Sequence, residues 1–287
     1  MKDYSDICDE WKQELLIYNG ILFNNQIFEN DYSDKLYYDF NCEEYKILSK
    51  KYNLSKIAGE GSAFEMVSRL TAYFAPGLTH KDDYDNHIEC NSLALLEYSF
   101  NKPEYGINCV NKSKILQECC LALGIYARRV WLMPCSPYDY DNHVVNEIFD
   151  FCLQKWIMID MTANGYFRDE NKTPLSVLEM RSIFAQNKVC ELVKFCDKPA
   201  EEFADRNMEQ IFYSKYFSKN LFYIIAEKVN RFGNGGAFLT FLPVNFNDAA
   251  RDAANSAFRS GTTLNKNIFD FKRSKSCDIK CLTEKPL

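Results

Sequence analysis

Hydrophobic residues recur at helical spacing in several stretches of the chain. Between positions 62 and 74 they stand three or four residues apart, at Phe64, Val67, Leu70 and Phe74. This period predicts an amphipathic helix, which stops at Pro76 because proline cannot continue a helix. The same reasoning predicts helices over 7–22, 92–100 and 109–124. Asn108 is the expected N-cap of the last one and Gly124 its expected C-cap.

Three extended segments follow the 109–124 helix. They span 125–133, 142–151 and 155–162, are rich in β-branched and aromatic residues, and are separated by turn-forming residues. A helix followed by an antiparallel sheet is typical of the α+β fold class. We therefore predict that the 109–124 helix packs on this sheet, with helical additions at both ends of the chain.

The remainder of the chain is less regular. Beyond Thr162 it is polar, and it then returns to helical periods at 175–184 and 208–229, while 238–244 is predicted to be a late strand. We divide the chain into an N-terminal extension packed on the core (1–55), the core (56–190) and a mostly helical C-terminal addition with a polar tail (191–287). The glycines at 233–236 fit no phosphate-binding pattern and are predicted to form an ordinary loop.

Composition narrows the class of protein. Of the 287 residues, 47% are hydrophobic and 15% aromatic, which is typical of a folded chain. The formal net charge of −6 argues against a nucleic-acid partner, and no apolar run reaches the ~18 residues of a membrane-spanning helix. The N-terminus lacks the pattern of a signal peptide, so we expect a cytoplasmic protein whose twelve cysteines are mostly free thiols. The sequence indicates no cofactor and leaves the oligomeric state open.

The cysteines of the 109–124 helix differ in their position along it. Cys109 is at the start, where unpaired N–H groups and the helix dipole stabilise a thiolate. Cys119 and Cys120 lie two to three turns further on, on the apolar side, and are predicted to be packing residues. Cys109 is therefore the candidate nucleophile. Lys112 falls on the same side, and the sequence leaves open whether its charge activates the thiol or extends to solvent.

A histidine and an aspartate stand where they can assist this thiol. His143 opens the second predicted strand and Asp160 ends the third. In an antiparallel hairpin the start of one strand lies beside the end of the next, so the two side chains are expected to be neighbours. In such a Cys-His-Asp triad the histidine takes the proton of the thiol and the aspartate fixes the orientation of the ring.

The spacing of these residues resembles the transglutaminase-like superfamily, in the pattern C…ALGI-x-AR-x-V…H-x-x-x-E…W-x-x-x-D-x-T. The match covers about 93–162, and it is carried by Cys109, Leu123, Gly124, Ile125, Ala127, Arg128, Val130, His143, Glu147, Trp156, Asp160 and Thr162. The resemblance implies a papain-like core with cysteine on a helix and histidine and aspartate on a sheet. Two positions depart from the family, because Asn108 replaces a common glycine and Val145 a common tryptophan. Both departures concern the walls of the cleft, and therefore the substrate.

The resemblance implies a cysteine enzyme that acts on a carboxamide or peptide bond through a thioester. We favour hydrolysis over amine cross-linking, with a peptide or protein as substrate, and we name Asn108 and Tyr140 as candidate substrate-binding residues. An arylamine N-acetyltransferase uses the same triad, but the segment before Cys109 lacks the Arg-Gly-Gly run of that family. The alternative is a catalytically inactive relative that serves as a binding or scaffold protein, since the superfamily contains both kinds.

Other polar clusters are weaker candidates. His80 and His87 stand near Asp82, Asp83 and Asp85, but no regular element fixes them, so we predict an exposed loop and no metal site. Cys277 and Cys281 have no second ligand pair for zinc. Arg128 is interpreted as a structural pairing residue with no part in the chemistry.

Overall fold

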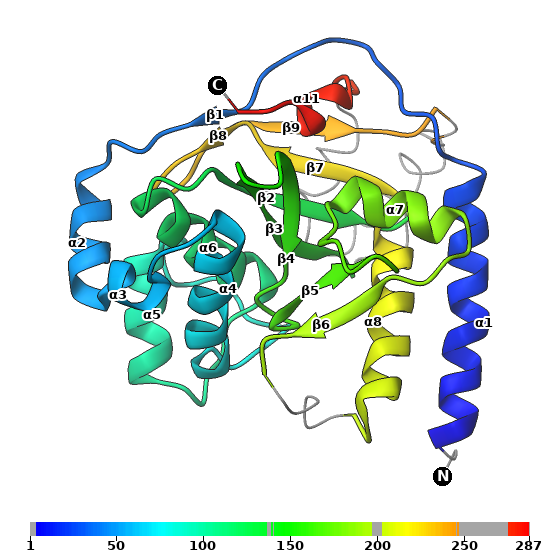
Figure 1. Ribbon diagram of the computed structural model, residues 1–287, viewed down its shortest axis with the longest axis horizontal. Coiled ribbons are helices and arrows are strands. Elements are labelled where there is room, and N and C mark those ends of the chain that lie inside the picture. Colours follow the sequence, from blue (N-terminus) through cyan, green and yellow to red (C-terminus); the bar gives the residue numbers. More distant parts are fainter. Residues whose placement is uncertain are drawn as a thin grey trace, which may run out of the picture.

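The computed structural model describes residues 4–136, 139, 141–196, 203–244, 246 and 275–286. Its centre is a five-stranded sheet in the order β4-β3-β2-β7-β9, in which all neighbours are antiparallel (Figure 1). The strands are β2 (Ala127–Met133), β3 (His143–Asp150), β4 (Lys155–Ile159), β7 (Tyr223–Glu227) and β9 (Phe238–Phe241). The chain is thus a mixed protein of the α+β class, as the sequence predicts.

One face of the sheet is covered by helices from the first half of the chain. They are α2 (Glu43–Tyr52), α3 (Leu54–Ala58), α4 (Ala63–Phe74), the 3-10 turn η1 (Ala75–Gly77), α5 (Ser92–Asn101) and α6 (Cys109–Ala122). Ile148 and Ile157 of the sheet share a core with Leu116 and Cys119 of α6. Because side chains alternate along a strand, Asn146 also points to this face, and its Nδ2 donates to the carbonyl of Ser113 at 2.9 Å.

The opposite face packs against α1 (Tyr4–Phe23), α7 (Val177–Ala185) and α8 (Arg206–Asn220), which lie together on the right of Figure 1. Val130 and Val145 of the sheet belong to this core, together with Met180 of α7 and Phe217 of α8. The sheet therefore separates two large hydrophobic cores, because side chains alternate along each strand. A third, smaller cluster is formed by Met133, Phe222, Tyr223, Ile225 and Leu242.

Two small sheets and the C-terminal segment complete the fold. β5 (Gly165–Arg168) pairs with β6 (Glu191–Lys194), and β1 (Tyr37–Tyr38) pairs in parallel with β8 (Val229–Asn230). The C-terminal segment carries the short α11 (Lys280–Thr283), and the N–H of Cys277 donates to the carbonyl of Thr240 beside β9. The segment between α1 and α2 runs across the top of the sheet in Figure 1. The C-terminal segment is thus joined to the edge of the central sheet.

Much of the predicted secondary structure is confirmed. The predicted helices at 7–22, 62–74, 92–100 and 109–124 correspond to α1, α4, α5 and α6, and the three predicted strands correspond to β2, β3 and β4. Ser62 caps α4 through a reciprocal capping box with Glu65. The C-cap of α6 is Leu123, one residue before the predicted Gly124. Gly124 follows it with a φ of +74°, a left-handed conformation that glycine adopts without strain.

The predicted helix over 208–229 is wrong in its second half. Helix α8 ends at Asn220, and residues 223–227 form β7, a fully buried strand in the sheet. A short apolar run that is buried on all sides has the same hydrophobic pattern in a helix and in a strand, so periodicity cannot distinguish them. As a result, the described residues of the segment 191–287, which was predicted to be mostly helical, form the strands β6 to β9 as well as the helices α8 and α11.

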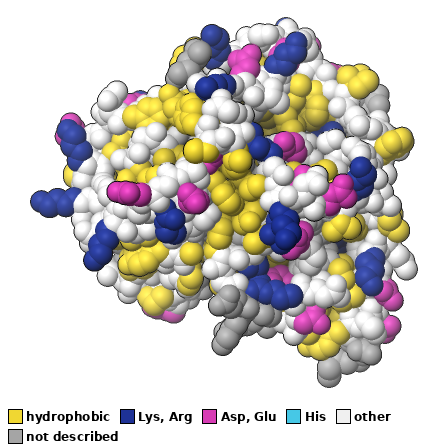
Figure 2. Space-filling model, viewed as in Figure 1, with side chains coloured by type: hydrophobic (Ala, Val, Ile, Leu, Met, Phe, Trp, Pro, Cys, Tyr) yellow, Lys and Arg dark blue, Asp and Glu magenta, His cyan; other side chains and the backbone are white. Residues whose placement is uncertain are grey.

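The surface carries no broad field of one charge in the view of Figure 2, where basic and acidic side chains alternate with exposed hydrophobic ones. Within the described ranges, no helix has the length and apolar character needed to cross a membrane.

Candidate functional site

The candidate site begins at the N-terminus of α6. Asn108 adopts an extended conformation, and its side chain accepts a hydrogen bond at 3.2 Å from the N–H of Asn111. This is the geometry of an N-cap, so Cys109 is the first helical residue, as predicted. Its side chain is partly exposed, and its own N–H is one of the helix-start amides without an intrahelical acceptor. The thiol therefore stands at the positive end of the helix dipole.

The approach to Cys109 depends on close packing of two backbone segments. The N–H of Ile107 donates to the carbonyl of Thr79, and the N–H of Lys81 donates to the carbonyl of Ile107. Gly106 has a φ of +67°, and a Cβ there would lie 2.9 Å from the Cβ of Lys81. Only glycine fits this position. The pairing brings His80 beside the segment that leads into α6.

His143 and Asp160 meet at the end of the sheet where β3 begins. Asn146 is opposite Ile159 in the β3–β4 register, which sets the two side chains on adjacent strands. The Nε2 of His143 is 2.9 Å from Oδ2 of Asp160, and both residues are almost fully buried. The other oxygen of Asp160 accepts a hydrogen bond at 2.7 Å from the N–H of Thr162. The adjacency predicted from the hairpin is thus present.

The Cys109 thiol lies close enough to the His143 ring to contribute to the raised pKa of the ring. Because Nε2 is used by Asp160, the nitrogen left for the thiol is Nδ1. Burial alone favours a neutral ring, but the charge of Asp160, its hydrogen bond and the contact with Cys109 outweigh it and raise the pKa of His143 to about 10. The arrangement therefore favours an imidazolium at neutral pH.

The pKa of the Asp160 carboxyl is shifted in the opposite direction, downward. Burial favours its neutral form, yet the charge and hydrogen bond of His143 and the N–H groups of Thr162 and Ala163 together lower the pKa of its carboxyl. The buried pair is thus an ion pair, with the carboxylate fixed at both oxygens. In chemical terms, Cys109, His143 and Asp160 can act as nucleophile, proton carrier and orienting group.

Helix α8 covers the histidine with two aromatic rings. Phe217 and Tyr216 lie edge-on to the His143 ring, with centroids 5.4 and 5.3 Å away. The hydroxyl of Tyr216 donates to Oδ1 of Asp141 at 2.9 Å, and Nζ of Lys219 lies 2.8 Å from the other oxygen of that carboxylate. The sequence gives no signal for Tyr216 and Phe217, because they belong to an ordinary helix more than seventy positions after the histidine.

The other cysteines of α6, and Arg128 with its neighbours, have structural roles. Cys119 and Cys120 are fully buried, and burial raises the pKa of both thiols. Arg128 donates to Oε2 of Glu147 at 2.6 and 3.0 Å, and its guanidinium lies 3.8 Å from the ring centroid of Trp156. This cluster packs under α7 through the N–H of Val177, which donates to Glu147. The interpretation of Arg128 as a structural partner is confirmed.

The other predicted sites have different outcomes. The Asn108 amide caps α6 and donates to Asn86 at 3.2 Å, so its polar atoms have partners within the protein. Tyr140 lies outside the described residues. His80 pairs with Asp82 at 2.6 Å and His87 with Asp85 at 2.5 Å.

In the part of the chain that the structure describes, no cluster of three His, Cys, Asp or Glu side chains could hold a metal ion. Each of the twelve cysteines is a free thiol.

His80 is closer to the candidate site than its sequence context indicated. Burial, the charge of Lys112 and that of His143 lower the pKa of His80, although Asp82 opposes this. The loop is exposed, as predicted, and the side chain of His80 is 32% accessible. The sequence gives no signal that His80 lies near the candidate site, because its location results from the backbone pairing of His80 with Ile107.

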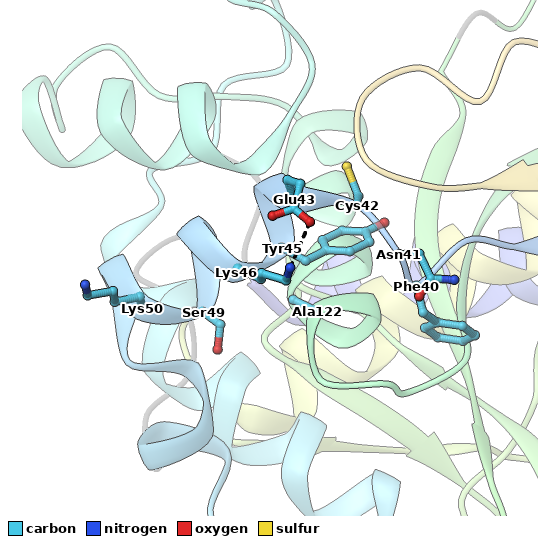
Figure 3. Close-up of a pocket in the computed structure, with 9 residues that line it drawn as sticks. All are labelled: Phe40, Asn41, Cys42, Glu43, Tyr45, Lys46, Ser49, Lys50 and Ala122. Carbon is cyan, nitrogen blue, oxygen red and sulfur yellow. Dashed lines mark hydrogen bonds and ion pairs between the residues drawn. The ribbon is translucent and has the colours of Figure 1, made fainter.

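A cavity of about 490 Å³ lies away from the triad (Figure 3). It is formed by the start of α2 and by Ala122, the last residue of α6, and Lys46 and Glu43 pair across its wall at 2.8 Å. Cys109 is at the other end of this 14-residue helix, about 20 Å away at 1.5 Å per residue. The cavity therefore does not belong to the candidate site.

Comparison of the chain with protein-family models, with curated proteins and with solved structures finds no match. The case for a function therefore rests on the geometry of the site and on the resemblance of its residue pattern.

Proposed function

We propose that this protein is a transglutaminase-like cysteine enzyme that cleaves a carboxamide or peptide bond through a thioester. One observation carries the proposal: Cys109, at the start of a helix, lies beside His143, whose ring is 2.9 Å from the carboxylate of the buried Asp160. A buried histidine between a thiol and a carboxylate is the arrangement that nucleophilic catalysis by cysteine needs.

In the proposed reaction the Cys109 thiolate attacks the carbonyl carbon of the substrate. The N–H of Cys109 stabilises the oxyanion, since it has no acceptor within the helix. The C–N bond then breaks, and His143 gives its proton to the departing amine, which leaves a thioester on Cys109. Water, which gives a proton to the now neutral His143, attacks the thioester; the carboxylic acid is released, and the Cys109 thiolate and the His143 imidazolium are restored.

Two parts of the proposal rest on the residue pattern. The papain-like core is supported by the chain order of α6, β3 and β4, with one member of the triad on each or at its end. Three further points are proposals of the same kind. They are that the enzyme hydrolyses its substrate rather than transferring it to an amine, that the substrate is a peptide or protein, and that the protein is cytoplasmic.

The test is selective alkylation of the full chain with a limiting amount of iodoacetamide at neutral pH, followed by peptide mass analysis. Cys135 and Cys152 are exposed, whereas Cys109 is only partly so, and this makes the exposed pair an internal control. We expect Cys109 to be labelled first, and His143→Ala to slow its labelling to the rate of Cys135 and Cys152.

Labelling of Cys135 or Cys152 ahead of Cys109 would contradict the enzyme and favour the inactive binding protein. If Cys109 is selectively labelled, incubation with glutamine peptides, with and without a primary amine, distinguishes the two reactions. Released acid indicates hydrolysis, and an amide of the added amine indicates transfer.

A further inference from the structure

The side chains of two adjacent arginines of β2 point to opposite faces of the sheet. Arg128 points away from α6 and binds Glu147. Arg129 points toward α6, and its Nη1 donates to the carbonyl of Val110 at 3.3 Å. Val110 is the residue after Cys109, so a buried guanidinium contacts the first turn of the helix that carries the candidate nucleophile.

Arg129 is itself held in a fixed orientation. Its Nη2 is 2.5 Å from Oε1 of Glu227, and its Nε is 3.2 Å from Oε2 of the same carboxylate. Glu227 belongs to β7, the strand beside β2. Burial favours a neutral carboxyl, but the charges of Arg129 and Lys114 outweigh it and lower the pKa of Glu227. The result is a two-point ion pair between neighbouring strands, which leaves the third nitrogen of the guanidinium directed at α6.

Side chains of α6 extend the Arg129–Glu227 ion pair into a hydrogen-bond network. Gln117 donates to Oε2 of Glu227 at 3.2 Å and to Asn230 at 2.8 Å. Lys114, fully buried one turn earlier, donates to Gln117 at 3.0 Å. Helix α6 is thus tied to β7 and to the residues after it over two successive turns.

The glycine loop at 233–236 joins the same network. The N–H of Gly233 donates to Oε1 of Glu118 at 2.8 Å, and the other oxygen of Glu118 accepts from the N–H of Ser92 at 2.7 Å. A Cβ at Gly235 would lie 2.0 Å from the carbonyl of Val229, so this loop position requires glycine. The glycine cluster therefore has a packing role against α6.

Stability alone is a weak explanation for such a network. Removing two charges from water costs free energy that their attraction often fails to recover, and apolar residues of similar volume are frequently as stable. A network of directional bonds does specify one position of the helix, which apolar packing does less strictly.

We propose that Arg129 is a positioning residue that sets the location of Cys109 relative to His143. The inference rests on the proposed function. His143 is fixed independently by Asp160 and Phe217, so the separation of sulfur and ring depends on where the first turn of α6 lies. A displacement of about 1 Å at a reacting group can lower a rate about 100-fold.

The test compares Arg129→Lys with Arg128→Lys in the full chain. Both arginines are at least 96% buried and bind a glutamate, and in both variants a lysine keeps the charge but loses the planar fork. The first measurement is the rate of Cys109 alkylation by iodoacetamide as a function of pH. We expect Arg129→Lys to slow alkylation at neutral pH about tenfold or more and to move the profile toward that of Cys152, whereas Arg128→Lys keeps the wild-type profile.

A second measurement does not need a reactive thiol. The NMR titration midpoint of the His143 ring is compared with and without Cys109→Ser, in the wild type and in Arg129→Lys. We expect the serine substitution to change the midpoint less when Arg129 is replaced, because sulfur and ring are then further apart. An unreactive wild-type Cys109 would end the proposed function, and this measurement would still decide the role of Arg129.

Three results would overturn the inference. The first is an equal change of the His143 midpoint in both backgrounds, and the second is a wild-type alkylation profile in Arg129→Lys. The third is an equally large decrease of the Cys109 alkylation rate in Arg128→Lys. Should Arg129→Lys fail to fold, Glu227→Gln replaces it, because the isosteric amide frees the guanidinium from its ion pair while keeping the shape. A folded Glu227→Gln protein with the wild-type profile would equally refute the positioning role.

Discussion

The imidazole of His143 and the carboxylate of Asp160 lie 2.9 Å apart in the protein interior, where each is at least 97% buried. Their pKa values move in opposite directions, upward for the histidine to about 10 and downward for the aspartate. Each shift favours the charged form of its group, so the pair is an ion pair over a wide pH range. This relationship leads to the first two predictions.

The ionisation of His143 should contribute to the pH dependence of the free energy of unfolding. Since the pKa of His143 is raised in the folded state, its contribution is fully present below its ordinary value of 6.5 and is lost as the pH rises through about 10. We expect the free energy of unfolding to fall over this range more steeply in the wild type than in His143→Ala. Urea denaturation at a series of pH values measures both slopes, and identical slopes would contradict the assignment.

The pKa of Asp160 is shifted in the opposite direction, downward. The stability that Asp160 contributes is therefore present above its ordinary pKa of 3.8, and it is lost as the pH falls through the lowered pKa of the folded state.

Replacing Asp160 should affect reactivity and stability differently according to the substitution. Asp160→Asn keeps the shape but loses the charge, so we expect Cys109 alkylation to slow about tenfold or more. Asp160→Ala leaves a buried imidazolium without its partner, which costs about 3–5 kcal/mol of unfolding free energy. Alkylation rates and denaturation curves of the two variants test this. A fully reactive Asp160→Asn protein would remove the aspartate from the triad.

Asn108 offers a test of capping against substrate binding. Asn108→Ala should lower the unfolding free energy by about 1 kcal/mol, because the N–H of Asn111 loses its acceptor. Asn108→Ser preserves a cap and should restore most of that loss. If Asn108 has no role beyond the cap, the serine variant keeps the wild-type KM for a cleaved peptide. A raised KM at wild-type stability would instead assign it to substrate binding.

Cys120 should behave as a core residue. Its side chain is fully buried among apolar groups, so Cys120→Ser places a hydroxyl where a thiol packs, and we expect a loss of about 1–3 kcal/mol. In the native protein Cys120 should resist iodoacetamide and react only after unfolding, because burial raises its pKa. Fast labelling of native Cys120 would show that the packing of α6 differs from this description.

The local elements around the candidate site were predictable because their signals are local. Asn108 caps the helix that begins at Cys109, as its residue type indicates. His143 opens a strand whose hairpin partner leads to Asp160, and a short connection between antiparallel strands leaves little choice of neighbour. The secondary-structure pattern alone thus predicted the contact between the two.

Other features had no local signal. The apolar run that forms β7 has the same pattern as the end of a buried helix, and only its place between β2 and β9 makes it a strand. Tyr216 and Phe217 reach His143 because α8 packs on the sheet, which their own sequence context does not encode.

By itself the sequence determined where α6 begins and, to within about three residues, where α6 ends and where its neighbouring strands lie. It also distinguished Cys109 from Cys119 and Cys120 by their position along one helix. The tertiary structure decided which face each strand residue occupies, and so separated Arg128, bound to Glu147, from Arg129, bound to Glu227 and to the turn after Cys109. The physical reason is that caps and periodicity act within a few residues, whereas burial and ion pairing depend on which distant segments the sheet brings together.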